Sequence, residues 1–230
     1  MKDIHNHSLY GIDDGSTSFE ESIDILKLLE SEGVKEIVLT PHYIIGTNYN
    51  ASNDKKMELL NKLKYKTNIK LYLGNEVFLD NGIVELIKTN KISTINNSRY
   101  ILVELSLRNK MHYDHEMLYE LRKNGYIPII AHPERYLYYK IDELESFIEE
   151  GCLFQGNITS LGLKYGKEVK KRLIEMIKKN MIFVLGTDIH SPNIDLYLCK
   201  KELKKITNEE AFNKLIYKNF DIIINDGDII

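Results

Sequence analysis

The sequence is poor in cysteine and proline and has no tryptophan: its 230 residues include two cysteines and four prolines. Cys152 and Cys199 form no C-x-x-C pair, and no arginine stands six residues after either of them. This excludes a cysteine-nucleophile loop of the C-x5-R type and argues against a purely structural zinc site. Unpaired thiols are typical of proteins that stay in a reducing compartment, so we predict a cytoplasmic protein.

Long apolar runs and an excess of positive charge are also missing. No apolar stretch approaches the roughly 18 residues of a membrane span, and the polar first residues do not form a signal peptide. The formal net charge is −3, so no basic field attracts nucleic acid or an anionic membrane surface. We therefore predict a soluble protein with no membrane insertion and no nucleic-acid partner.

Short apolar or β-branched runs alternate with helical patterns along the whole chain. The first helix is expected to begin at Ser18, because Ser18 and Glu21 form a capping-box pattern. Seven strands are predicted, near residue 4 and within 36–42, 69–78, 99–106, 127–135, 152–157 and 181–190. Repeated β/α units give right-handed crossovers and parallel strands. No glycine-rich nucleotide-binding motif follows any strand, so we predict a closed seven-stranded β/α barrel and a single domain over residues 1–230.

The residues that carry chemistry gather at the carboxyl ends of these predicted strands. Five of the seven histidines lie there, together with three acids. These residues are His5, His7, His42, Glu76, Glu104, His132, Asp188 and His190. In a β/α barrel all such ends meet on one face, where barrel enzymes carry their active sites.

The spacing of these residues favours metal binding. In H-x-H on an extended segment both imidazoles point to the same side, so His5 and His7 can grip one ion. A mixture of imidazole and carboxylate suits Mn²⁺, Fe²⁺ or Zn²⁺. The donors are too many for one ion, so we expect two or three ions bridged by a carboxylate such as Glu76. Sites of this kind commonly hydrolyse phosphate esters.

Several neighbouring residues admit two interpretations. Arg135 is either a phosphate-binding fork or the partner of a helix acid. Asp13 stands close to glycines and can belong to a turn. His112 and His115 lie in a loop-to-helix region and are either structural or close to the substrate. A single histidine is more often structural. The prediction of a metal site therefore depends on the fact that histidines and acids recur at the ends of successive strands.

The motifs DIHNH, TPH, GNE, AHPER and GTDIH resemble, in this order, those of the PHP (polymerase and histidinol phosphatase) superfamily over nearly the whole chain. With GIDDG and VELS, the combination is similar to the bacterial manganese-dependent protein-tyrosine phosphatases of capsule and exopolysaccharide synthesis. The resemblance implies a distorted, TIM-like seven-stranded β/α barrel with a trinuclear metal centre. It also implies a substrate, the tyrosine-rich tail of a membrane-associated tyrosine autokinase.

The resemblance further implies which residues bind which ion. The first ion would be held by His5, His7, Glu76 and Asp188, the second by Glu76, Glu104 and His132, and the third by Asp14, His42 and His190. Arg135 matches the phosphate-binding arginine of the family. Some members carry a second arginine shortly after the D-x-H motif, but here that segment reads SPNIDLYLCKK. A lysine or a backbone group is left for that role.

The expected reaction is direct hydrolysis without a covalent intermediate, because bound cations lower the pKa of water near them. Two alternatives stay open. The first is a histidinol phosphatase of the same superfamily, against which the short loops argue. The second is a non-catalytic metal-binding or scaffold domain, against which the intact ligand set argues.

Overall fold

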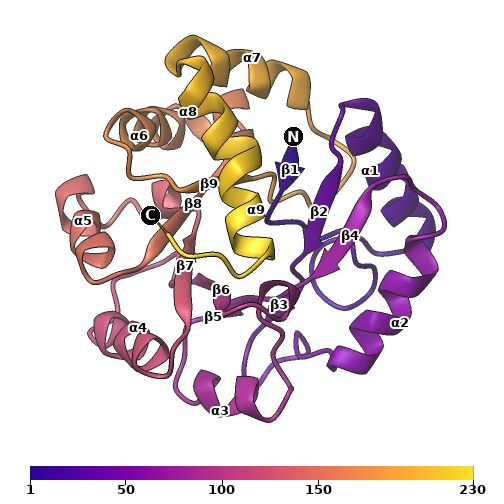
Figure 1. The fold of residues 1–230 in the computed structure, drawn as a ribbon, viewed down its shortest axis with the longest axis horizontal. Coiled ribbons are helices and arrows are strands. Elements are labelled where there is room, and N and C mark those ends of the chain that lie inside the picture. The colour runs from indigo at the N-terminus through magenta and orange to yellow at the C-terminus, as the bar shows by residue number, and fades with distance from the viewer. Residues whose placement is uncertain (230) are drawn as a thin grey trace.

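The computed structural model describes residues 1–229, in which helices surround parallel strands (Figure 1). The strands are β1 (Lys2–Asp3), β2 (Glu36–Leu39), β3 (His42–Tyr43), β4 (Lys70–Leu73), β5 (Glu76–Phe78), β6 (Tyr100–Glu104), β7 (Ile127–Ala131), β8 (Leu153–Asn157) and β9 (Val184–Gly186). The α-helices are α1 (Phe19–Ser31), α2 (Asn53–Leu63), α3 (Ile83–Lys88), α4 (Asp114–Lys123), α5 (Ile141–Glu149), α6 (Gly166–Lys178), α7 (Leu196–Ile206), α8 (Glu209–Asn213) and α9 (Asn219–Ile224). Three 3-10 turns, η1 (Ile95–Asn97), η2 (Pro133–Arg135) and η3 (Ile158–Gly162), and a π-helical turn, η4 (Lys214–Lys218), complete the described elements. Within residues 1–229, no helix has the length and apolar character needed to span a bilayer.

The strands form two parallel sheets. One has the order β1-β2-β4, and the other has the order β3-β5-β6-β7-β8-β9 and curls into a half-barrel. Every pairing between neighbouring strands is parallel. The α/β class and the parallel strands predicted from the sequence are therefore confirmed. The single closed seven-stranded barrel is not confirmed, because the ladder is divided between two sheets.

The division falls inside two segments that the sequence predicts as single strands. The segment 36–42 is observed as β2 and β3, and the segment 69–78 as β4 and β5. Pro41 lies between β2 and β3, and proline has no N–H to donate to a ladder. The N–H of Glu76 is instead shared between the carbonyls of Thr40 and Pro41, each at 3.3 Å. Pairing resumes in β3 and β5, which begin at two predicted metal ligands.

The first and last strands meet near their carboxyl ends. An isolated parallel bridge joins Asn6 to Ile189. The buried carboxylate of Asp3 accepts hydrogen bonds from the backbone N–H of Thr187 at 2.7 Å and from its hydroxyl at 2.6 Å. These contacts place the N-terminal H-x-H motif beside the D-x-H motif, although about 180 residues separate the two in the sequence.

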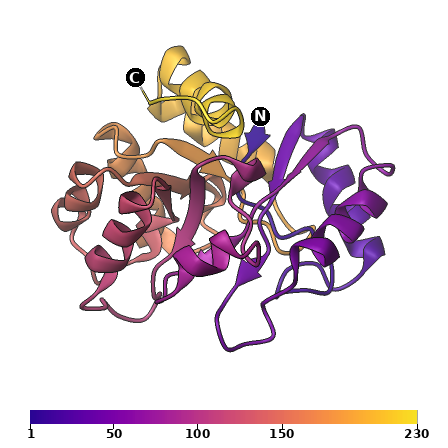
Figure 2. The ribbon, with the colours of Figure 1, turned by 60° about the horizontal axis from the view of Figure 1, so that its bottom comes forward.

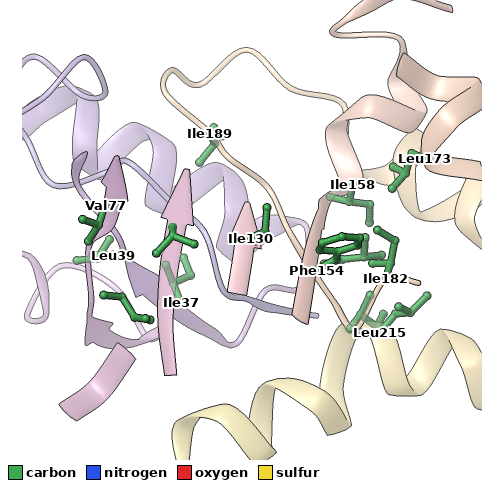
Figure 3. Packing of buried hydrophobic residues seen from close by; sticks show 14 of the residues in the cluster. Ile37, Leu39, Val77, Ile130, Phe154, Ile158, Leu173, Ile182, Ile189 and Leu215 are labelled. Atoms are coloured by element: carbon green, nitrogen blue, oxygen red, sulfur yellow. The ribbon is translucent and has the colours of Figure 1, made fainter. Parts of the chain in front are cut away.

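Side chains of the strands alternate between two apolar clusters, as the period of two requires. Ile37, Ile130 and Phe154 belong to the larger cluster, which lies between the strands and the helices (Figure 3). Their sequence neighbours Val38 and Ile129 belong to the smaller cluster, which fills the space enclosed by the strands. The strands are therefore apolar on both faces, which is expected of parallel strands covered by helices.

The apolar run 220–224, whose conformation the sequence leaves open, forms helix α9. Phe220, Ile223 and Ile224 of this helix join the cluster enclosed by the strands. Figure 2 shows the C-terminal helices, in yellow, at one end of the molecule beside the N-terminus. The amino group of Met1 also lies 3.0 Å from the hydroxyl of Tyr217. Helix α9 thus covers the amino ends of the strands and leaves their carboxyl ends for the functional site.

Candidate metal centre

The nine residues predicted as metal ligands lie together at the carboxyl ends of the strands. Their donor atoms fall within 4.8 Å of one another in three groups: His5, His7, Glu76 and Asp188; His7, Asp14, His42 and His190; and His42, Glu76 and Glu104. The ninth residue, His132, places its Nε2 atom 3.0 Å from Glu76 Oε1 and 3.5 Å from Glu104 Oε1. The structure therefore brings all nine together, with Glu76 at the centre.

Unusual backbone geometry aims two of these side chains. His132, directly after β7, has φ of 34°, and Asp188, two residues after β9, has φ of 50°. Residues other than glycine seldom adopt this left-handed conformation, and such strain collects at functional sites. Close packing adds a constraint at Gly186, where a Cβ atom would lie 2.6 Å from the Cβ of His5. The glycine of the GTDIH motif is therefore required by the approach of the first strand.

A hydrogen bond at Nδ1 orients each ring of the H-x-H motif. His5 Nδ1 lies 2.7 Å from the amide oxygen of Gln155, and His7 Nδ1 lies 2.8 Å from Asp13 Oδ2. Both partners are acceptors, so each Nδ1 carries the ring proton and each Nε2 of a neutral ring keeps its lone pair. The two Nε2 atoms face each other at 3.0 Å. A metal-binding histidine commonly donates its other ring N–H to an acceptor in this way, so both rings are oriented to offer Nε2 to an ion.

Two carboxylates face the same pair of nitrogen atoms. Glu76 Oε2 lies 3.1 Å from His5 Nε2 and 3.2 Å from His7 Nε2. Asp188 Oδ1 lies 3.5 and 3.6 Å from those same atoms. Four electron-pair donors that converge on one point repel one another unless positive charge lies between them. Burial would lower the pKa of His7, but the neighbouring carboxylates of Asp13 and Glu76 raise that pKa well above the ordinary value.

Buried polar atoms without partners give an independent test of whether these residues fit a metal. Glu76 Oε2 and His42 Nδ1 are both shielded from solvent, and neither has a hydrogen-bond partner among the described residues. The two atoms lie 3.1 Å apart. Native structures seldom leave such groups unpaired, and a missing ion is one of the recognised reasons. The residues present therefore fit a metal centre.

The two oxygens of Asp188 have different surroundings. Oδ2 accepts hydrogen bonds from Asn157 Nδ2 at 2.7 Å, from the Tyr165 hydroxyl at 2.9 Å and from the Arg135 guanidinium at 3.2 Å. Oδ1 faces the imidazoles. Burial opposes ionisation, but the charges of nearby histidines hold the pKa of Asp188 below its ordinary value. The protein thus fixes one oxygen and leaves the other for a cation.

Burial shifts the pKa values of Glu104 and His132 in opposite directions and thereby favours the uncharged form of both. Burial, followed by the charge of Glu76, raises the pKa of Glu104 to about 9. Burial, followed by the charge of Arg135, lowers the pKa of His132 to about 4. Near neutral pH and without a cation, His132 is neutral and Glu104 is protonated. A bound cation would favour the carboxylate form of Glu104, since cations reverse the local effect of burial on acids.

An open pocket of about 430 Å³ lies over this cluster. Its lining combines residues predicted as metal ligands with two cationic and several apolar or aromatic side chains. The members that are not predicted ligands are Ile44, Tyr49, Leu107, Arg135, Lys164 and Tyr165. The Tyr49 ring is nearly parallel to the His42 ring, at 6.1 Å between centres. Such a pocket suits an anion attached to an aromatic ring.

Some residues of the site escape prediction from the sequence. The interpretation of Asp13 as a turn residue is incomplete. Its Oδ1 atom accepts a hydrogen bond from the N–H of Gly15, as in a turn. Its Oδ2 atom accepts hydrogen bonds from the N–H of His42 and from Nδ1 of His7. Gln155 and Asn157 belong to none of the motifs recognised in the sequence. Their one signal is that they alternate on β8, so both point to the side that bears the site.

His115 lies apart from the cluster. Its Nδ1 is 2.8 Å from a carboxylate oxygen of Glu150, and its ring stacks on that of Phe147 at 4.2 Å between centres. The structural interpretation of this histidine is therefore the one that the structure supports.

Sequence comparisons relate this geometry to a known family. The family described as "Capsular polysaccharide synthesis, CpsB/CapC" matches residues 1–225. CapC of Staphylococcus aureus is 35% identical, over 100% of this chain and 91% of CapC. The tyrosine-protein phosphatase YwqE of Bacillus subtilis is 29% identical, over 83% of this chain and 78% of YwqE.

Solved structures agree with this relationship. A structure from a study of YwqE of Bacillus subtilis and CpsB of Streptococcus pneumoniae, described as metal-dependent tyrosine phosphatases, matches with a TM-score of 0.91 at 26% identity. The match covers 100% of this chain and 96% of the other. Histidinol phosphate phosphatase of Lactococcus lactis, with a TM-score of 0.59 at 14% identity over 89% of this chain and 92% of its own, shares the fold alone. The chain therefore belongs to the CpsB/CapC family of capsular polysaccharide synthesis.

Proposed function

We propose that this protein is a metal-dependent protein-tyrosine phosphatase. The observation that carries the proposal is the convergence of nine imidazole and carboxylate side chains beneath an open pocket that also presents Arg135. Membership of the family supports it, since relatives named tyrosine-protein phosphatases match 83% and 98% of this chain. The intact donor set argues against a scaffold without activity, because scaffolding does not require such a set on an open face.

We assign the ligands as three overlapping sets. The first ion is held by His5, His7, Glu76 and Asp188, the second by Glu76, Glu104 and His132, and the third by Asp14, His42 and His190. Short distances within each set support this assignment. Mn²⁺ is the proposed metal, with Fe or Zn as alternatives, because the donors mix imidazole and carboxylate and include no thiolate. When bound, such ions lower the pKa of water and polarise phosphoryl oxygens.

The protein's own side chains bind and orient the substrate. The Arg135 guanidinium has five N–H donors, and the contact with Asp188 uses one nitrogen, NH1. The others can bind phosphoryl oxygens in pairs and stabilise the charge that develops on them. Ile44, Tyr49 and Leu107 offer apolar contact to an aromatic ring. This rim favours phosphotyrosine over the small aliphatic phosphate of a histidinol phosphatase.

Neither cysteine is suited to act as a nucleophile. Cys152 and Cys199 are both buried and unpaired. Burial raises the pKa of Cys152 to about 12 and that of Cys199 to about 11. The thiolate is the reactive form, so both thiols are inert near neutral pH. Hydrolysis is therefore proposed to proceed directly, without a phosphocysteine intermediate.

Restoring Mn²⁺ to protein stripped with EDTA is expected to restore hydrolysis of p-nitrophenyl phosphate and of a phosphotyrosine peptide. The reason is that the proposed reaction requires metal ions bound by the imidazole and carboxylate donors. Iodoacetamide is expected to leave the rate unchanged. The measurement is release of inorganic phosphate, with histidinol phosphate as the comparison substrate. Activity that survives chelation and is lost on alkylation would contradict the proposal, and a faster rate on histidinol phosphate would favour the alternative.

Asp13→Asn is expected to weaken Mn²⁺ binding by about 10- to 100-fold, the usual effect of removing a group that orients a ligand. The amide can donate to His7 Nδ1 and so favours the tautomer that hides the Nε2 lone pair. Isothermal titration with Mn²⁺ measures the change, and Asp24→Asn on the exposed face of α1 is the matched control. Equal affinities for the two variants would show that Asp13 serves the turn alone.

The physiological substrate is proposed to be the phosphotyrosine-containing tail of a bacterial tyrosine autokinase that regulates capsular polysaccharide synthesis. The family's description in capsule synthesis supports this partner. The unpaired thiols of Cys152 and Cys199 support a cytoplasmic location.

The two sheets are proposed to act as one distorted seven-stranded barrel of the PHP type, forming a single domain over residues 1–230. Two observations support this. The break between the sheets falls inside two predicted strands, and the bridge between Asn6 and Ile189 links the first sheet to the last strand of the second.

A further inference from the structure

The pocket contains a second cation that the sequence motifs do not mark. No arginine lies in the segment 191–201, which follows the D-x-H motif. Lys164, in the connection between η3 and α6, lines the same pocket as Arg135. A phosphomonoester carries about two negative charges near neutral pH, so a single guanidinium leaves part of that charge without a protein partner.

The ammonium group of Lys164 is turned toward the site. The residue as a whole is exposed, but its Nζ atom donates a hydrogen bond to the backbone carbonyl of Asp188 at 3.1 Å. Among residues 1–229, no carboxylate lies within ion-pair distance of this group. Its ammonium therefore faces the pocket without a direct ion pair, and two of its three N–H donors are left for a ligand.

One aromatic ring supports both cations. The Arg135 guanidinium lies 4.5 Å from the centre of the Tyr165 ring, and Lys164 Nζ lies 5.0 Å from the same centre. The Tyr165 hydroxyl donates to Asp188 Oδ2 at 2.9 Å, which fixes the ring against the cluster of predicted ligands. Cations are attracted to the face of such a ring. Tyr165 thus holds two positive side chains, from two different segments, beside one carboxylate.

A buried carboxylate ties those two segments together. Glu134, which precedes Arg135 in η2, is fully buried. Its Oε1 atom accepts hydrogen bonds from the N–H of Asn157 at 3.0 Å and from the hydroxyl of Ser160 in η3 at 2.9 Å. Arg172 of α6 also donates to the carbonyl of Glu134 at 3.2 Å. The connection that carries Lys164 is therefore anchored to η2 on both sides, so the two cations keep a fixed relation.

We propose that Lys164 is the second phosphate-binding side chain of this pocket, acting together with Arg135, and that Tyr165 is a positioning residue for both. The ligand is the phosphate group of an aryl phosphomonoester, and the inference rests on the proposed function for that identity. The lysine comes from the η3–α6 connection, 24 residues before Asp188, so the D-x-H motif does not mark it in the sequence.

The test compares Lys164→Met with Lys164→Arg and with Lys167→Met, an exposed lysine at the start of α6. Binding of inorganic phosphate to the Mn²⁺-loaded proteins is measured by calorimetry, and kcat and KM are measured on p-nitrophenyl phosphate. Lys164→Met is expected to weaken phosphate binding and raise KM by about 5- to 20-fold, the loss of a charge-assisted hydrogen bond. Lys164→Arg is expected to restore most of the affinity, and Lys167→Met to match the parent protein.

Unchanged phosphate affinity in Lys164→Met would overturn the inference and leave the phosphatase function standing. A parent protein that binds phosphate but hydrolyses no phosphoester would contradict the proposed function, while the phosphate titration would still report on Lys164. Mn²⁺ titration of Lys164→Met is expected to match the parent, and a weakened Mn²⁺ affinity would show that the lysine acts on the metal cluster and not on phosphate.

The positioning role of Tyr165 is tested by a double-mutant cycle on phosphate affinity. Tyr165→Leu alone is expected to weaken phosphate binding, because both cations lose their shared support. Combined with Lys164→Met, it is expected to add less than its separate effect, since residues in contact are not additive. Fully additive effects would overturn the positioning role, whereas a merely structural role would change the melting temperature and leave the phosphate affinity intact.

Discussion

Glu76→Gln is expected to reduce hydrolysis of aryl phosphates by about 10³-fold or more, which corresponds to roughly 4 kcal/mol of transition-state stabilisation. Glu76 belongs to two of the three proposed ligand sets. Its Oε2 atom lies 3.1 Å from both His5 Nε2 and His42 Nδ1, and its Oε1 atom lies 3.0 Å from His132 Nε2. The amide has the same shape but brings neutral oxygen and N–H groups, so it removes charge from two ions at once.

The measurement of Glu76→Gln combines kcat/KM at saturating Mn²⁺ with the metal content of the purified protein. Glu85→Gln, the same change at an exposed position of α3, is the matched control and is expected to leave both quantities unchanged. Asp188→Asn and His132→Ala are expected to reproduce the loss with the fold retained. If Glu76→Gln kept its metal content and rate, the assignment of a bridging carboxylate would be wrong.

The sequence predicts the positions of the site residues better than their surroundings. Alternation along a strand places His5 and His7 on one side, and the structure holds their ring centres 5.1 Å apart. The sequence did not indicate which side chains orient these two rings. A neutral amide such as Gln155 occurs at many positions on strands, so its presence does not mark a site. Tyr165 reaches Asp188 across 23 residues from an irregular connection, where no periodicity indicates which way a side chain points.

The same limit applies to the secondary structure. Ser18 caps α1 as predicted, since its hydroxyl accepts from the N–H of Glu21 at 3.1 Å. The reciprocal half of the capping box is different: the Glu21 carboxylate accepts from the N–H and the hydroxyl of Thr17, one residue before the cap. The sequence also predicted one continuous strand across Pro41. An apolar and β-branched run does not indicate where a strand stops pairing in one sheet and begins pairing in another.

Lys56 gives the second large effect, on stability and its dependence on pH. This lysine of α2 is fully buried, and its ammonium donates to the side chains of Asn75 and Ser93. No carboxylate pairs with it within the described residues 1–229. Burial lowers the pKa of Lys56 from 10.5 to about 7. Protonation of this amine therefore costs more free energy in the folded protein than in the unfolded chain.

The sign of the pH effect follows from proton binding. Between the folded pKa near 7 and the unfolded value of 10.5, the unfolded chain binds a proton that the folded protein does not. Stability therefore rises with pH through this window, and the penalty of the buried charge is complete below it. From pH 7 to pH 9 the contribution of Lys56 is expected to grow by about 2 kcal/mol in favour of the folded state.

Lys56→Met is expected to be more stable than the parent protein at pH 7, and this advantage is expected to be about 2 kcal/mol smaller at pH 9, because methionine carries no proton to release. The hydrogen bonds that remain keep the site in place: Asn75 still accepts from the N–H of Ser93 at 2.9 Å, and the Ser93 hydroxyl still donates to Asn53 at 2.7 Å. Urea unfolding in EDTA at both pH values measures the difference, since chelation removes the separate pH dependence of metal binding. Lys55→Met, at an exposed position of the same helix, is expected to show no such dependence. A difference between Lys56→Met and the parent that stays constant with pH would mean that the buried amine keeps the same protonation state folded and unfolded, and so has partners that offset its burial.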